Sequence, residues 1–355
     1  MLQLTEAIKS FGRRVFDSAP ALPFPDTLNI ESSYACNLKC MMCPRHFDGV
    51  PQGMFSLEMF EQHVEPYIGK FKWVHLTGWG ETLMNKDLPE IITRCRKAGV
   101  WVAFTTNGLL LKSPLDRKIL ETGVEHVSIS CDADNAETYE IVRGKATFTH
   151  LVERARTFNA LKREMKSQTS VQWVFVMMRS NFRQLPGAVR LAADLGYDLF
   201  AAKHMETAIT RGELSEALWN TGMAPDVEPE ILAENDALIA EAQQIAEERG
   251  LRFVLHPRQM HHNNTCLVRP VTNLFIDYEG RVSSCCYLNK NDVRPYNTPA
   301  EKPKTDGVYG DLRLRNLMEI LEGEEYKTFQ REWLAGRVPE ACRNCLNVNR
   351  MGTKP

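Results

Sequence analysis

The sequence lacks any long apolar run. Its longest apolar stretch, Val171–Met178, is interrupted by Gln172 and is far shorter than the about 20 residues that a membrane-spanning helix needs. Residues 1–20 contain Lys9, Arg13 and Arg14 among scattered apolar residues, and no continuous hydrophobic segment of the kind found in signal peptides. We therefore expect no membrane segment and a cytoplasmic location.

The chain also lacks an excess of charge of either sign. Its 43 Lys and Arg residues nearly balance its 45 Asp and Glu residues, so the formal net charge at pH 7 is −2. Non-specific binding to nucleic acid requires a basic surface that neutralises phosphates, and an anionic membrane surface makes the same demand. We therefore expect neither nucleic acid nor membranes as partners.

Cysteine, in contrast, is plentiful, with ten residues in a chain of 355. A chain of this length can bury a large α/β core and a smaller second one, so it does not need disulfides as a small secreted domain does. Without a signal peptide, the cysteines are interpreted as reduced and metal-binding.

Strand-like and helix-like segments alternate over residues 26–205, which predicts parallel βαβ units. Six such units fit an α/β fold with a partial, open (β/α)6 barrel, whose working groups lie at the carboxyl ends of the strands. We expect an amphipathic helix and linker over residues 1–25 and a connecting, helix-containing segment over 206–259. A small domain with a β-hairpin and helix is expected over 260–355. The expected strands are 28–32, 72–76, 100–105, 126–130, 171–178 and 199–203.

Three cysteines, Cys36, Cys40 and Cys43, follow the first expected strand in the pattern Cys-x3-Cys-x2-Cys. Spacing this tight lets three thiolates converge on one face of a loop. Three thiolates can hold three corners of a cubane iron–sulfur cluster and leave the fourth iron open. Soft thiolates also suit zinc, although a structural zinc site takes four ligands and a catalytic one usually mixes ligand types.

This pattern resembles the signature of the radical S-adenosylmethionine (SAM) superfamily. The resemblance implies that the open iron of a [4Fe–4S] cluster binds the amino and carboxylate groups of SAM. One electron from the reduced cluster then cleaves SAM to a 5′-deoxyadenosyl radical, which abstracts hydrogen from a substrate. It further implies a flavodoxin or ferredoxin-type electron donor. The alternative is a zinc knuckle.

The second expected strand leads into Gly78, Trp79, Gly80 and Glu81. Taken alone, this is an ordinary turn. Its place one β/α unit after the cysteines is similar to the glycine–glycine–glutamate motif of the radical SAM superfamily, with Trp79 in place of the second glycine. The resemblance implies that Gly80 and Glu81 help to bind the amino group of SAM, with Gly78 letting the backbone approach closely.

Polar residues follow the remaining strands. A Tyr-x3-Arg-Gly pattern at Tyr139 and Arg143 is also similar to the radical SAM superfamily, and Arg143 is interpreted as an anion binder or a surface ion pair. Lys203 and His204 are predicted to contact substrate or to act as a base, although a histidine there could equally be structural. The other predicted SAM contacts at strand ends are Thr106, Asn107, Ser130, Asp132, Arg179 and Asn181.

A second set of cysteines lies near the carboxyl terminus: Cys266, Cys285, Cys342 and Cys345. One precedes an expected hairpin with its turn at 277–280, one follows it, and two form a distant Cys-x2-Cys pair, which together could close a metal site. This resembles the SPASM/twitch extension of radical SAM enzymes, with one auxiliary [4Fe–4S] cluster as in 2-deoxy-scyllo-inosamine dehydrogenase-type enzymes. Because neighbours on a strand face opposite sides, Cys286 is interpreted as filler or as a hydrogen-donating thiol.

A fully ligated auxiliary cluster has no iron free for substrate, so its use is to accept or conduct electrons. We therefore predict an oxidoreductase with a dehydrogenase-like oxidation of a small polar metabolite such as a sugar or cyclitol. The alternatives are modification of a ribosomally made peptide, which the short stretch before the first strand weakens, and redox-neutral epimerisation with Cys286 or Cys131 as hydrogen donor. The non-enzymatic alternative is a zinc-stabilised binding module.

Overall fold

A computed structural model describes residues 22–43, 45, 52–144, 146–205, 216, 218, 227–256, 266, 268–289 and 307–342. The helix expected near the amino terminus and Cys345 lie outside these residues. Within them, a ten-stranded sheet has the order β10-β9-β8-β1-β2-β3-β4-β5-β6-β7.

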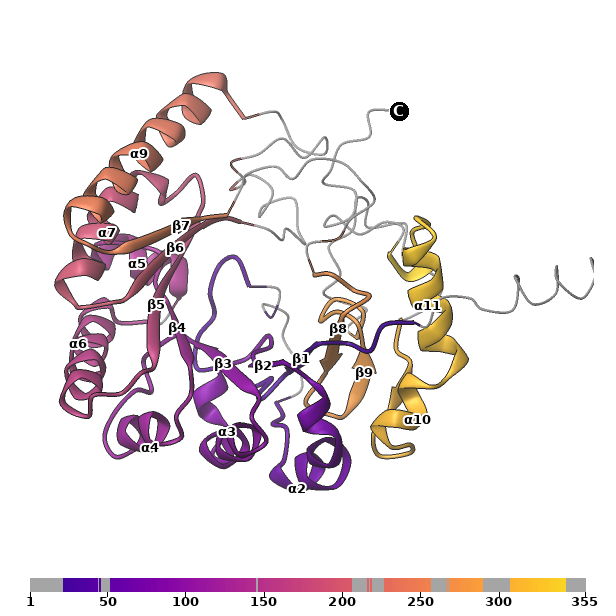
Figure 1. Ribbon diagram of the computed structural model, residues 1–355. Helices are drawn as coiled ribbons and strands as arrows, with labels where there is room; N and C mark the ends of the chain where they lie inside the picture. Colours follow the sequence, from indigo (N-terminus) through magenta and orange to yellow (C-terminus); the bar gives the residue numbers. More distant parts are fainter. Residues whose placement is uncertain are drawn as a thin grey trace, which may run out of the picture.

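The strands β1 to β7 run parallel to their neighbours, and β8 runs parallel to β1 on its other side. In Figure 1 they follow an arc, which is the open barrel that the alternating pattern predicts, so the fold class is confirmed. The strands are β1 (Thr27–Ile30), β2 (Trp73–Leu76), β3 (Trp101–Thr106), β4 (His126–Ser130), β5 (Ser170–Met177), β6 (Leu199–His204), β7 (Arg252–Leu255), β8 (Asn273–Ile276), β9 (Arg281–Ser283) and β10 (Gly310–Asp311).

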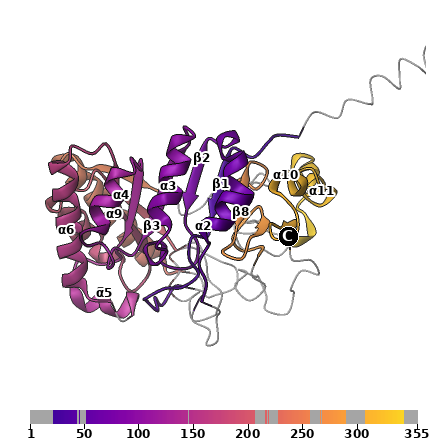
Figure 2. The same ribbon diagram turned by 90° about the horizontal axis from the view of Figure 1, so that it is seen from below.

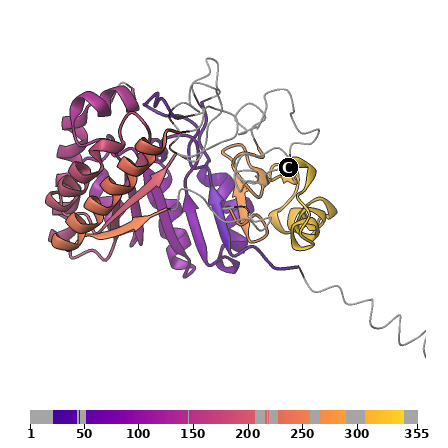
Figure 3. The same cartoon turned by 90° about the horizontal axis from the view of Figure 1, so that it is seen from above.

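Helices lie along the outer side of the arc, and α10 and α11 lie at its carboxyl-terminal end beside β8 and β9 (Figure 1). Seen from below, α6 and α11 lie at opposite ends of the described part of the chain (Figure 2), and the view from above shows the yellow carboxyl-terminal helices at one end (Figure 3). The helices are α2 (Leu57–Met59), α3 (Leu88–Lys97), α4 (Leu115–Glu121), α5 (Ala136–Arg143), α6 (Phe148–Glu164), α7 (Leu185–Asp194), α9 (Pro229–Glu248), α10 (Leu317–Leu321) and α11 (Glu324–Leu334).

Strict alternation along β5 shows how the sequence builds the barrel. Val171, Trp173 and Phe175 are at most 1% exposed and pack under the helices, whereas Gln172 and Val174 face the barrel interior and are half-buried. Full burial of an apolar side chain stabilises the fold by about 1.5–3 kcal/mol. The interior face is therefore free to carry polar groups, while the outer face holds the sheet to its helices.

The helical segment between β1 and β2 is irregular. Ser56 caps its start, because its hydroxyl accepts a hydrogen bond from the Met59 amide at 3.1 Å. The segment then passes through a π-helical turn, Phe60–Val64, into a 3₁₀ helix, Glu65–Lys70. Pro66 has no amide hydrogen to donate, so a regular α-helix cannot continue through it.

The described part of residues 206–259 adds a seventh β/α unit to the six expected. Strand β7 pairs in parallel with β6, and α9 packs against α7. Ile239, Ala242 and Ile245 form the buried face of α9, and an Arg190–Glu241 ion pair joins its outer side to α7. The acidic outer face explains why the sequence suggested a solvated connector.

The carboxyl-terminal hairpin forms as predicted. Asp277 accepts hydrogen bonds from the amides of Glu279 and Arg281 at 3.0 and 2.9 Å, and Gly280 takes a φ of +91°, which glycine adopts without strain. Because β8 pairs with β1, the hairpin continues the barrel sheet. None of the helices in the described ranges is long and apolar enough to cross a membrane.

Candidate active site

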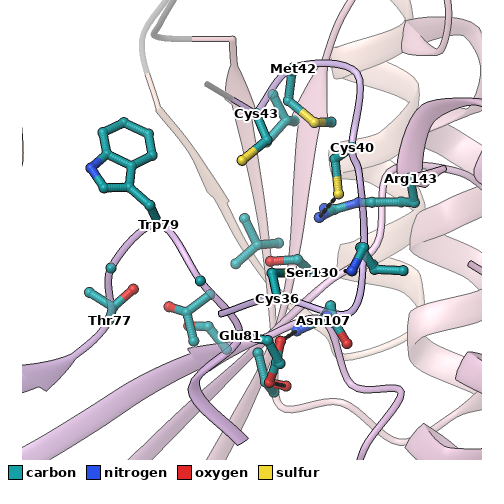
Figure 4. Close-up of a pocket in the computed structure, with 18 of the residues that line it drawn as sticks. Cys36, Cys40, Met42, Cys43, Thr77, Trp79, Glu81, Asn107, Ser130 and Arg143 are labelled. Carbon is teal, nitrogen blue, oxygen red and sulfur yellow. Dashed lines mark hydrogen bonds between the residues drawn. The ribbon is translucent and has the colours of Figure 1, made fainter. Parts of the chain in front are cut away.

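A cavity of about 500 Å³ lies at the carboxyl ends of the strands, a size typical of small-molecule sites. Figure 4 shows the cysteine loop on one side of it and the ends of the central strands on the other. Most of the residues predicted to bind cofactor meet here. Those that line the cavity include Cys36, Cys40, Cys43, Gly78, Gly80, Glu81, Thr106, Asn107, Ser130, Arg143 and Lys203.

The cysteine loop is held from two sides. The Met41 amide donates to the Val142 carbonyl of α5 at 2.9 Å, and the Asn107 side chain donates to the Asn37 side chain at 2.8 Å. Gly144 ends α5 with a φ of +51°, and a β-carbon there would lie 2.3 Å from the Lys39 carbonyl oxygen. The glycine of the Tyr-x3-Arg-Gly pattern therefore lets α5 pack directly against the loop.

The three thiols of the loop lie in a largely desolvated setting. Burial raises the pKa of all three above the usual value, to about 12 for Cys43. Arg143 opposes this at Cys40, where its Nη1 lies 3.9 Å from Sγ (Figure 4). Such thiols stay protonated until a cation compensates the thiolate charge, as a bound metal does.

The chemistry of the cysteine loop suits an iron–sulfur cluster. Cubane clusters take thiolate ligands that each bind a different iron. Cys36, Cys40 and Cys43 line one cavity, with a guanidinium beside Cys40, so the loop supplies three ligands of the right kind.

The Gly78–Glu81 segment is built around close backbone contacts. The amides of Gly80 and Glu81 donate to the carbonyls of Ser33 and Ala35 at 3.1 and 2.8 Å. A β-carbon on Gly80 would lie 2.2 Å from the Ser33 oxygen, so only glycine fits. The segment is thereby fixed to the chain immediately before the cysteine loop.

Glu81 is 2% exposed and its carboxylate accepts three hydrogen bonds. The donors are the Thr106 hydroxyl at 2.5 Å, the Asn107 amide at 2.7 Å and the Leu83 amide at 3.0 Å. Burial raises the pKa of Glu81, and the three donors oppose that shift by stabilising the anion. Thr106 and Asn107, at the end of β3, therefore act on the site through Glu81 as well as by lining the cavity.

Arg143 and Asp132 form a buried ion pair, with 2.5 Å between Nη2 and Oδ2. Asp132 is fully buried and accepts the Val176 amide at 2.8 Å, so it lies behind the cavity rather than on its wall. Burial raises the pKa of Asp132, while the guanidinium works against this. The pair orients Arg143 toward Cys40 and the cavity, and Ser130, two residues before Asp132, lines the wall directly.

Besides Asp132, three predicted strand-end residues lie away from the described cavity wall. Asn181 links β4 to β5, since its amide donates to the Asp132 and Val176 carbonyls at 2.9 Å each. Arg179 pairs with Glu228 at 2.8 Å. His204 lies on the outer face of β6 and contacts Asn235 of α9 at 3.2 Å, because it alternates with Lys203, which faces the cavity.

The carboxyl-terminal region reaches this cavity through Tyr287. Cys266, Cys285 and Cys342 pack against the same hydrophobic core as the barrel. The Trp79 ring meets the Tyr287 ring edge-on with 5.1 Å between centroids, and its Nε1 lies 3.5 Å from the Cys286 carbonyl oxygen. Trp79 and Tyr287 line the cavity, whereas the Cys286 thiol is not on its described wall.

Sequence reasoning missed Tyr287, Gln172 and His256 as parts of this wall. Gln172 had a signal, because a single amide within an apolar strand indicates the face that is not covered by helices. Trp79 also gave a signal for Tyr287, because a tryptophan in place of a glycine implies another side chain that packs against its ring. His256 follows a strand that the sequence did not reveal.

Comparison with known families agrees with this geometry. The model of the radical SAM superfamily matches residues 30–173, and that of an iron–sulfur cluster-binding domain, SPASM, matches residues 266–346. The fold is similar to that of Streptococcus suis SuiB bound to S-adenosylmethionine, with a TM-score of 0.63 and 15% identity, covering 86% of this chain and 68% of SuiB.

Two curated relatives span most of the chain. The chain is 22% identical over 306 residues to the tungsten-containing aldehyde ferredoxin oxidoreductase cofactor-modifying protein of Pyrococcus furiosus, covering 85% of this chain and 82% of the relative. It is 24% identical over 331 residues to a PqqA peptide cyclase of Xanthomonas euvesicatoria, covering 91% and 80%. The chain thus contains a radical SAM domain followed by a SPASM iron–sulfur cluster-binding domain.

Proposed function

We propose that this protein is a radical SAM oxidoreductase whose SAM, first cluster and substrate share the cavity above the barrel. The observation that supports this best is the meeting of Cys36, Cys40 and Cys43 with Gly80 and Glu81 in one cavity. When bound, the two cofactors supply a radical that takes a hydrogen atom from a substrate C–H bond, and an auxiliary cluster supplies an acceptor for the second electron.

The chain's own residues would position these groups. Glu81 presents a carboxylate to the amino group of SAM, held in place by its three donors. Arg143 offers a cation beside Cys40 that is already paired and oriented by Asp132. Because these partners are in place before any ligand binds, little reorganisation is needed on binding.

The auxiliary cluster is proposed to bind Cys266, Cys285, Cys342 and Cys345, the last of which lies outside the described residues. Contact between Trp79, Tyr287 and the Cys286 carbonyl brings this region to the cavity wall, which favours electron transfer from substrate over an unrelated structural role. We therefore favour oxidation of a small polar metabolite, with Lys203, which lines the cavity, contacting an anionic group.

A second candidate is oxidative modification of a peptide. It is favoured by the similarity to a PqqA peptide cyclase over 91% of this chain. In that case the cavity would receive one side chain of a longer substrate.

The test is anaerobic reconstitution followed by reduction in the presence of SAM. We expect about eight irons per chain for two [4Fe–4S] clusters, and release of 5′-deoxyadenosine. Turnover with deuterated candidate substrates, metabolites in one series and peptides in another, should then place deuterium in that product. A colourless, zinc-containing protein that leaves SAM intact would refute the proposal.

A further inference from the structure

A second cavity of about 380 Å³ lies in the barrel interior, one or two residue layers further from the cysteine loop. Strand register places His75, Ala103 and His126 side by side in one layer. Ser128 and Gln172 pair in the next. Thr77, Thr105, Ser128 and Gln172 line both cavities, so the interior cavity adjoins the cofactor cavity.

The small side chain of Ala103 lies between His75 and His126 and leaves space between their rings. A larger side chain at this position would fill the gap between His75 and His126. Trp101 lies beside both histidines. Its ring centroid is 5.8 Å from that of His75, with the rings tilted by 56°, and 6.1 Å from that of His126, with the rings 23° from parallel. The cavity therefore offers aromatic faces on which a ring compound could stack.

Some polar atoms of this cavity are paired with one another, and others have no hydrogen-bond partner among the described residues. His126 Nε2 and the Ser128 hydroxyl both approach the amide oxygen of Gln172, at 2.7 and 3.1 Å. Within the described ranges no hydrogen bond uses the amide nitrogen of Gln172 or either ring nitrogen of His75. Polar groups in a protein interior bind something, either ordered water or a ligand.

The cavity is also uncharged. No Asp, Glu, Lys or Arg occurs among the described residues that line it. Burial lowers the pKa of His75 and His126, which favours the neutral imidazoles. Neutral donors and acceptors in a desolvated space bind hydroxyl, amide or heterocyclic groups, whereas an isolated charge there would lose its hydration without compensation.

We propose that this interior cavity binds the non-reacting part of the substrate, and that this part is an uncharged ring with hydrogen-bonding groups, such as a cyclitol, sugar or nucleoside. The inference rests on the proposed function, because the reacting carbon would then project into the adjoining cofactor cavity. Lys203, near the carboxyl end of β6, lines the cofactor cavity and could contact an anionic substituent of the same substrate.

The test is equilibrium binding to the reconstituted full chain, under anaerobic conditions with saturating SAM, followed by saturation-transfer NMR. The probes are myo-inositol, glucose and uridine, with glutamate and lysine as charged acyclic comparisons. Gln172→Leu removes the amide at similar size, and Ala103→Phe fills the space. Ser170→Ala, in the layer of His126 but not on the described cavity wall, is the matched control.

We expect at least one ring probe to bind the wild type and S170A equally. Loss of the Gln172 hydrogen bonds should weaken binding about tenfold, and A103F should abolish it. If A103F does not fold, Q172L still decides the outcome. The proposal is overturned if no ring probe binds at up to about 10 mM, if the acyclic charged probes bind better, or if Q172L binds like the wild type.

SAM cleavage by the wild type, measured in parallel samples after reduction with dithionite, separates this proposal from the proposed function. Cleavage without ring binding would overturn only the inference about the interior cavity. Ring binding without cleavage would overturn the radical SAM activity and leave a ring-binding protein.

Discussion

Polar side chains are bonded differently in two regions of the barrel: its rim, where the cofactor cavity lies, and its interior, where the second cavity lies. At the rim, Glu81 accepts three hydrogen bonds and Arg143 lies between Cys40 and Asp132. In the interior, the ring nitrogens of His75 and the amide nitrogen of Gln172 make no hydrogen bond within the described ranges. Groups that serve one fixed ligand are best preorganised by the protein. Polar groups without a protein partner can instead bond to a substrate. Changing such groups lets one fold bind different substrates in different relatives.

Substitution of the loop cysteines should have the largest effect on SAM cleavage, because no other described side chain at the rim replaces a missing thiolate ligand. Cys36→Ser, Cys40→Ser or Cys43→Ser should each reduce SAM cleavage to background and lower the iron content from about eight to about four per chain. Cys95→Ala is the control, because Cys95 is fully buried within α3, away from the cavity. Iron analysis and chromatography of 5′-deoxyadenosine measure both. Full cleavage by C40S would contradict the assigned ligands.

Breaking the Arg143–Asp132 pair should have the next largest effect. Arg143→Gln leaves the Asp132 carboxylate buried without its partner, which typically costs about 3–5 kcal/mol of unfolding free energy. Denaturant unfolding measures this. The double variant R143Q/D132N removes both charges and should recover much of the loss. If the single and double variants have the same free energy of unfolding, the ion pair does not hold Arg143 in place as proposed.

Glu81→Gln should weaken SAM binding about 10- to 100-fold. An amide at this position presents N–H groups to a site in which Thr106 and Asn107 already donate, so the geometry around the former carboxylate is disrupted. Equilibrium dialysis with labelled SAM gives the dissociation constant. Glu90→Gln, on the exposed side of α3, should leave it unchanged. Equal binding by E81Q would mean that Glu81 is structural only.

Asp116 of α4 is a buried polar side chain outside both cavities, so it shows what a missing hydrogen-bond partner costs where no ligand binds. It is 1% exposed and its Oδ1 has no hydrogen-bond partner, so burial raises its pKa from 3.8 to about 6. A raised folded-state pKa means that the folded chain binds the proton more tightly. Stability is therefore lost as pH rises through this range and stays reduced above it.

Asp116→Asn should accordingly be more stable than the wild type at pH 7, by about 1–2 kcal/mol. The difference should shrink as pH falls from about 6 towards about 4. Thermal unfolding across this range measures it, with Glu121→Gln on the same helix as control. A pH-independent difference would show that the carboxyl does not titrate there.

The sequence predicted most of the rim, because close spacing along the chain ties Cys36–Cys43 and Gly78–Glu81 to adjacent strands. It could not show that Asn181 and His204 turn away, since that depends on where each strand ends and which face continues. The interior cavity was also beyond it, because His75, Ala103 and His126 are brought together only by register between three strands. The pairing of β7 with β6 follows from the same long-range packing.

Strand β1 hydrogen-bonds to β2 on one side and to β8 on the other. The cysteine loop leaves the end of β1, and Cys285 follows the hairpin that β8 begins. A strand paired on both edges cannot act as a hinge, so the two cysteine regions are spaced by sheet geometry, about 4.8 Å per strand, and not by a tether. In the proposed function an electron would pass between these two regions, and electron tunnelling falls steeply with distance. The paired strands beneath the two regions would then limit how far that distance varies.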